Sequence, residues 1–171
     1  MRRIAGSSRD VTLWSLRRQA VPVATTLAAC LLEALPIVWT TPIVPDLAYL
    51  TLIAWRLLRP EIWPAYVALP LGLFDDLISG HPLGQSMALW TMTFLIFDLA
   101  DSRVGWRDYW MDWLFASAAI LFYTFATWYV AHLTGSRLAV MVLAPHFLLS
   151  VLAYPLIARL VIAFDRWRLG R

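Results

Sequence analysis

Residues 113–133 read WLFASAAILFYTFATWYVAHL and contain no Asp, Glu, Lys or Arg. A second long apolar block follows at residues 138–164, in which His146 and Arg159 are the exceptions. A helix needs roughly 20 apolar residues to cross a hydrocarbon core of about 30 Å. Both blocks therefore predict transmembrane helices, and they set the fold class as an all-α integral membrane protein.

The composition of the whole chain agrees with this interpretation. Of 171 residues, 61% are hydrophobic and 15% charged, and the mean hydropathy is +0.67. Soluble domains are closer to half apolar and a quarter charged. The length favours a single membrane domain over residues 1–171, in contact with membrane lipid. The one cysteine excludes an internal disulfide framework and any multi-cysteine metal site.

Apolar blocks of unequal length divide the chain into six predicted spans. They cover residues 20–39, 43–58, 62–78, 87–99, 113–133 and 138–164. The second and fourth blocks are short, and each is either a tilted helix or a re-entrant half-helix; hydropathy leaves both alternatives open.

The arginines predict the orientation. All 14 basic residues are arginine, and they lie between the apolar blocks, so the net charge of +3 does not form the basic face that nucleic acid needs. Cytoplasmic loops collect basic residues. Six spans place every arginine except Arg137 on one side, whereas five would separate the N-terminal and C-terminal clusters. We therefore expect six spans with both termini in the cytoplasm, the first being a retained helix and not a cleaved signal peptide.

Three acids within the predicted spans are candidate functional residues, because ionisable groups at membrane depth are costly. Glu33 is the deepest, Asp46 lies near the start of the second span, and Asp98 lies near the end of the fourth. Glu33 is a proton or cation site, a partner for a buried arginine, or a hydrogen-bonded carboxyl that closes a helix contact. Asp98 and Asp101 are expected to pair with Arg103 or Arg107.

The connection between the third and fourth spans carries the most distinctive pattern. Residues 72–84 read GLFDDLISGHPLG. Gly80 and Gly84 can adopt backbone angles closed to other residues, and Pro82 stiffens the chain between them. A carboxylate just before such a turn can accept hydrogen bonds from the free N–H groups of the loop. Asp76 is thus a loop organiser or part of a ligand or partner site.

The histidines give no metal-binding signature. His81, His132 and His146 show no i, i+4 spacing, and no acid stands at a useful offset from them. We expect neither a metal nor a cofactor.

Two motifs resemble the rod shape-determining protein MreD family. One is Pro-Asp-Leu at residues 45–47, and the other is Gly-Leu-x-x-Asp-x-x-x-Gly-x-Pro-Leu-Gly. The second motif corresponds to Gly72, Leu73, Asp76, Gly80, Pro82, Leu83 and Gly84. The resemblance covers roughly residues 20–165, has residue-level detail from 45 to 84, and makes Asp76, not Asp75, the family-type acid.

The resemblance implies a non-catalytic scaffold in the bacterial inner membrane that maintains rod cell shape. Proteins of this family partner the bitopic MreC, which links outward to the RodA glycosyltransferase with its class B penicillin-binding protein and inward to MreB. Their helical fold is similar to the substrate-binding subunits of energy-coupling-factor vitamin transporters. A small-molecule-binding transporter subunit is therefore the alternative function, and Glu33, as a polar residue within a predicted span, leaves it open.

An intramembrane aspartyl enzyme is disfavoured. Such a dyad needs two carboxyls that share a proton within hydrogen-bonding reach. Asp76 and Asp98 are expected at opposite membrane faces, and the chain contains no asparagine of the kind that signal peptidase II uses.

Overall fold

The computed structural model describes residues 8–33, 44–102, 108–135 and 140–169, and within these ranges it contains helices and no strand. The α-helices are α1 (Ser8–Glu33), α2 (Leu47–Leu58), α3 (Ala68–Ser79), α4 (Gln85–Asp101), α5 (Tyr109–Leu133) and α6 (Leu143–Leu169). Short 3-10 helices, η1 (Ala65–Val67) and η2 (Val140–Val142), precede α3 and α6. The all-α prediction is confirmed for the described part of the chain.

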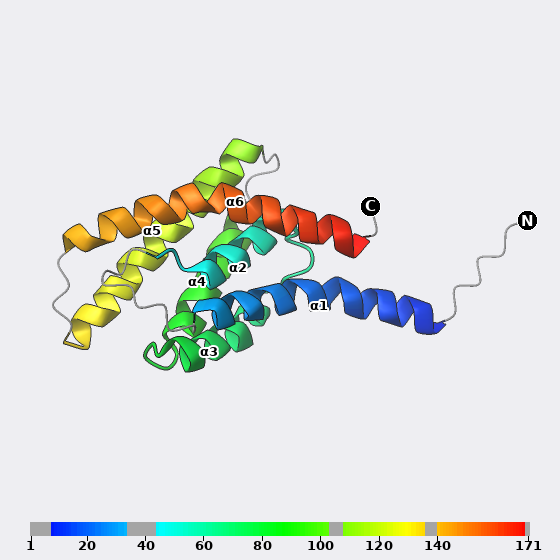
Figure 1. Cartoon of the computed structure of the whole chain (residues 1–171), viewed down its shortest axis with the longest axis horizontal. Helices are drawn as coiled ribbons and strands as arrows, with labels where there is room; N and C mark the ends of the chain where they lie inside the picture. Colours follow the sequence, from blue (N-terminus) through cyan, green and yellow to red (C-terminus); the bar gives the residue numbers. More distant parts are fainter. Residues whose placement is uncertain (1–7, 34–43, 103–107, 136–139, 170–171) are drawn as a thin grey trace, which may run out of the picture.

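Several helix boundaries differ from the predicted spans. Helix α1 is continuous from Ser8, and its first turns extend beyond the other helices (Figure 1). It ends at Glu33, and residues 34–39 of the predicted span lie outside the described residues. Helix α4 is longer than predicted, and α3 begins only at Ala68. Hydropathy marks where apolar side chains lie, but backbone hydrogen bonding decides where a helix begins and ends. The predicted spans and the observed helices therefore differ at their ends.

Helix α2 forms the centre of the core. Every residue from Ala48 to Leu57 is buried, and the helix contacts α1, α5 and α6. A helix that is covered all round is a core helix. With 12 residues it is about 18 Å long, shorter than a hydrocarbon core of about 30 Å.

A polar contact at Tyr49 joins three helices inside this core. The Tyr49 hydroxyl lies 2.9 Å from Thr93 Oγ1 on α4, and it donates a hydrogen bond of 3.1 Å to the Ala119 carbonyl on α5. Its ring stacks on Tyr123 with centroids 4.1 Å apart. A buried hydroxyl needs such partners, and here they fix the positions of α4 and α5 relative to α2.

Close backbone contact joins α3 to α4 at Gly72. A Cβ atom at this position would lie 2.6 Å from both Cα and N of Met87, so no larger side chain fits without a backbone shift. Gly72 therefore sets the separation between α3 and the first turn of α4.

Within the described ranges, α5 and α6 are the two helices long and apolar enough to cross a membrane. Only 28% of the most apolar part of α5 and 17% of that of α6 are buried inside the protein, which is unlike a core helix of a soluble domain. On α6 the exposed residues include a stripe with four-residue spacing, namely Leu148, Leu152, Leu156 and Leu160. Exposed apolar surface of this extent suits contact with lipid.

Buried arginine pairs lie where α2, α4 and α6 end. Arg56 is 1% exposed and pairs with Asp98 and, at 3.0 Å, with Asp101. The expected partners of these acids, Arg103 and Arg107, lie outside the described residues; among the described residues, Arg56 is a further partner that the sequence argument did not predict. The last turn of α2 faces that of α4, which brings a residue distant in sequence within reach.

A second ion-pair group attaches α6 to the same end of α2. Arg59 pairs with Asp165 at 2.8 Å, and Asp165 also pairs with Arg168 one turn later. The Arg168 guanidinium lies over the Trp55 ring, 5.5 Å from its centroid. We call these two groups together the arginine end of the molecule.

Removing the acidic partners of Arg56 should cost more stability than removing the arginine. The double variant Asp98→Ala/Asp101→Ala leaves a buried charge unpaired, and we expect it to lose about 3–5 kcal/mol of unfolding free energy. Arg56→Met removes the charge, keeps an apolar stem, and leaves two acids that retain access to solvent. Chemical unfolding in detergent micelles measures the unfolding free energy of both variants. If the double variant is as stable as Arg56→Met or more stable, the ion-pair account is contradicted. Asp98→Ala alone is the control and should be milder, because Asp101 remains.

Candidate functional site

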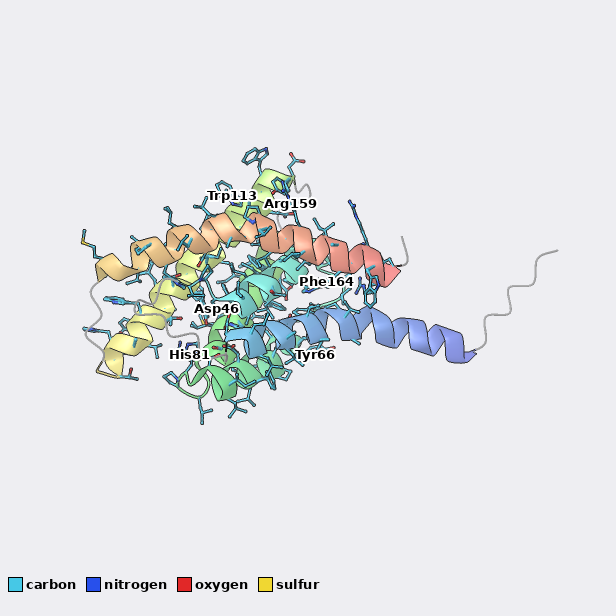
Figure 2. The ribbon with its side chains drawn as sticks, viewed as in Figure 1. Asp46, Tyr66, His81, Trp113, Arg159 and Phe164 are labelled. Carbon is cyan, nitrogen blue, oxygen red and sulfur yellow. The ribbon has the colours of Figure 1, made fainter. Side chains whose placement is uncertain are left out.

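Four acids and a histidine converge at the end of the molecule opposite the arginine end. Glu33 closes α1, Asp46 precedes α2, Asp75 and Asp76 lie in the last turns of α3, and His81 follows in the loop. We call these five residues the acidic cluster. Figure 2 shows Asp46 and His81 on the same side of the molecule, close to the end of α1, and the two groups interact electrostatically.

Two of the acids satisfy the first turn of α2. The Asp46 carboxylate accepts a hydrogen bond of 2.7 Å from the Tyr49 amide, and Glu33 Oε1 accepts one of 2.8 Å from the Ala48 amide. The first four N–H groups of a helix have no partner within the helix, so a buried N-terminus needs outside acceptors. Glu33 is the last described residue of α1, and its carboxyl group reaches the next helix, which is the helix-closing contact that the sequence left as one of its alternatives.

Asp76 accepts hydrogen bonds from the backbone amides at the start of α4 in the same way. Its Oδ1 accepts a hydrogen bond of 2.7 Å from the Ser86 amide, and its Oδ2 accepts bonds of 2.8 Å from Gly84 and 3.4 Å from Met87. These are the contacts of a loop-organising residue, one of the two alternatives that the sequence left open. They hold the α3–α4 turn closed.

The glycines of the motif make this turn possible. Gly80 and Gly84 have φ angles of 72° and 93°, in the left-handed region where a side chain is strained. Between them, Pro82 and Leu83 point outward, and Leu83 is 73% exposed. Asp76 therefore holds the turn from its buried side, and Leu83 is exposed on its outer side.

Asp75 has different neighbours. It is fully buried, and its Oδ1 accepts a hydrogen bond of 3.2 Å from the Ser79 hydroxyl. Its Oδ2 has no hydrogen-bond partner and lies 3.7 Å from His81 Nδ1. The buried thiol of Cys30 on α1 faces the same carboxylate. The neighbouring Asp75 carboxylate raises the pKa of His81, although partial burial of the imidazole opposes this shift.

Asp75, Asp76 and His81 each place one potential metal ligand atom in a common group. These atoms all lie within 4.8 Å of one another. The sequence argument missed this group because it searched for histidines at helical spacing. The turn that begins at Gly80 instead brings His81 back toward the two acids. His132 lies elsewhere, stacked on Trp128 near the end of α5.

Tyr123 on α5 was not identified from the sequence either. Its hydroxyl is buried and faces Asp46 and Ser86 without forming a hydrogen bond. Within an apolar block a tyrosine looks like any other aromatic residue, so only the packing of α5 reveals that its hydroxyl points toward the acidic cluster.

Asp98 does not belong to the acidic cluster. It lies 12 residues after Ser86 on α4, which separates the two by about 18 Å along the helix. Asp76 on α3 contacts the first turn of α4, whereas Asp98 lies near the end of α4, so the two acids are far apart and do not form a dyad.

Comparison of the chain with protein-family models, with curated proteins and with solved structures gives no match.

Truncating Asp76 should destabilise the turn. In Asp76→Ala the amides of Gly84, Ser86 and Met87 lose their acceptor, and we expect a loss of about 1–3 kcal/mol in unfolding free energy. Asp76→Asn keeps one acceptor oxygen and should lose less.

The matched control is Asp108→Ala. Asp108 also precedes a helix, but its side chain makes no capping hydrogen bond. It should unfold like the unchanged protein in a thermal melt in detergent. Equal melting of the Asp76→Ala and Asp108→Ala variants would show that the three hydrogen bonds add no stability.

Proposed function

We propose that this chain is a non-catalytic scaffold of the bacterial cell-elongation machinery, similar to MreD proteins, in the inner membrane. The support from sequence is the motif from Pro45 to Gly84. The support from geometry is that its most distinctive residues act together: Gly72 allows close contact with α4, Asp76 binds the amides of the turn, and Gly80 and Gly84 provide its backbone angles.

Six membrane crossings are part of the proposal. The ends of the helices alternate between the acidic cluster and the arginine end, as expected for a chain that passes back and forth. Helix α1 begins, and α6 ends, at the same side of the molecule (Figure 1). This arrangement supports two cytoplasmic termini next to the arginine end. The shorter helices require a tilted path or a locally thinner bilayer.

The outward-facing turn is the proposed contact with a partner. Leu83 is exposed on a backbone that Asp76 holds rigid, so it can bind without an entropic cost for ordering the loop. The proposed partner is an MreC-like bitopic protein, whose segment next to the membrane would meet this turn. Through it the scaffold would reach the RodA-type glycosyltransferase, the class B penicillin-binding protein and MreB.

Reporter fusions test the topology. Alkaline phosphatase, which is active only in the periplasm, should be inactive when fused after Arg171 and active when fused in the loop at Gly135. Green fluorescent protein fused at the C-terminus should fluoresce. A C-terminal phosphatase fusion with full activity would contradict an even number of crossings.

Co-purification tests the partner. Burial of a leucine side chain is worth about 1.5–3 kcal/mol, so Leu83→Ser should reduce recovery of the MreC-like protein from native membranes by about tenfold or more. Leu133→Ser is the control, because Leu133 is similarly exposed at the end of α5. Equal recovery with both variants would exclude the turn as the contact. A vitamin-type subunit, the alternative function, would instead retain a small molecule and no MreC-like protein.

A further inference from the structure

Asp75 is the acid of the cluster that has no part in capping a helix. Glu33, Asp46 and Asp76 each accept hydrogen bonds from amides at a helix N-terminus, whereas Asp75 receives only the Ser79 hydroxyl from the described residues. Its second oxygen is buried, accepts no hydrogen bond, and lies 3.7 Å from His81 Nδ1. A buried carboxylate oxygen without a hydrogen bond is unfavourable unless a cation or a proton compensates it.

The compensating charge is not an arginine of the described chain. Arg56, Arg59 and Arg168 form ion pairs with Asp98, Asp101 and Asp165, all at the arginine end. From the N-terminus of α2 to Arg56 is about 14 Å along the helix axis, which is beyond the reach of a direct pair. At the acidic cluster His81 is the neighbouring group that can carry a positive charge, and it lies 3.7 Å from Asp75.

The three donor groups have capacity for a metal ion. Asp75 Oδ2 accepts no hydrogen bond, and Asp76 accepts three where a carboxylate offers about four acceptor positions. Around a tetrahedral zinc ion the donor atoms would lie about 3.4 Å apart. The present atoms all lie within 4.8 Å of one another, and the His81 side chain, which is 33% exposed, has room to move toward the two acids.

A second feature points to a bound species at this place. The Tyr123 hydroxyl is a buried polar group on another helix, its residue is 4% exposed, and it has no hydrogen-bond partner. It faces Asp46 and Ser86 and interacts with Asp75. A hydrated ion between these groups would give both the hydroxyl and Asp75 a partner.

We propose that Asp75, Asp76 and His81 bind a divalent transition-metal ion of the zinc class at the acidic end of the molecule. Two carboxylates and an imidazole suit zinc, whereas calcium and magnesium prefer sites made of oxygen alone. The nearby thiol of Cys30 also favours a borderline-soft ion. Three protein ligands leave a coordination position for water. The ion would tie the end of α3 to the turn after it, and this inference is independent of the scaffold function.

The test is metal retention by the full-length protein, purified in detergent with a streptavidin-binding tag so that no added histidine interferes. The protein is treated with a chelator, exposed to zinc chloride, desalted and analysed by mass spectrometry for metals. We expect about one zinc per chain, and no comparable retention of calcium or magnesium. A zinc content below about a tenth of this value would overturn the proposal.

Two ligand variants and one control make the assignment specific. Asp75→Asn and His81→Gln should each weaken zinc binding by more than about tenfold, as loss of a ligand is at least as costly as loss of a supporting contact. His132→Gln removes an exposed histidine outside the group and should retain zinc. His81→Gln keeps the test valid if Asp75→Asn does not fold, because His81 is partly exposed in a loop. Equal zinc retention in all three variants would overturn the proposal.

Discussion

Buried helix N-termini impose the strongest constraint on this structure. Each helix starts with N–H groups that lack an internal partner, and in a buried position there is little water to replace one. Helix α2 is enclosed on all sides, so its first amides depend on Glu33 and Asp46. Helix α4 depends in the same way on Asp76. Acids that look anomalous in an apolar chain are therefore explained by the backbone that they satisfy.

This constraint also accounts for the separation of charge in the molecule. Carboxylates at helix N-termini interact favourably with the positive end of the helix dipole, as do arginines near helix C-termini with the negative end. In α2 the two effects occur at opposite ends, because Asp46 lies at its start and Arg56 in its last turn. Ion pairs with α4 and α6 then hold the C-terminal end of the helix in a buried position.

The sequence predicted those features that depend on local pattern. Residues 113–133 indicated a membrane-length helix, and the glycines around Pro82 indicated a tight turn with a carboxylate inside it. It failed where contacts join distant segments. The ion pair between Asp98 and Arg56 was not predicted, and neither the position of Tyr123 nor that of His81 follows from spacing along one helix. Hydropathy also did not distinguish α2, which protein surrounds, from α6, which exposes its leucines.

The adjacent acids Asp75 and Asp76 illustrate how one turn of helix can serve two purposes. Neighbouring residues point about 100° apart, so the two carboxylates necessarily face different surroundings. Asp76 faces the amides at the start of α4 and accepts three hydrogen bonds from them, while Asp75 faces α1, its own helix and His81. The first arrangement gives the turn its shape. The second leaves a buried carboxylate oxygen without a hydrogen bond, and a species that binds such a group in the folded state adds to its stability.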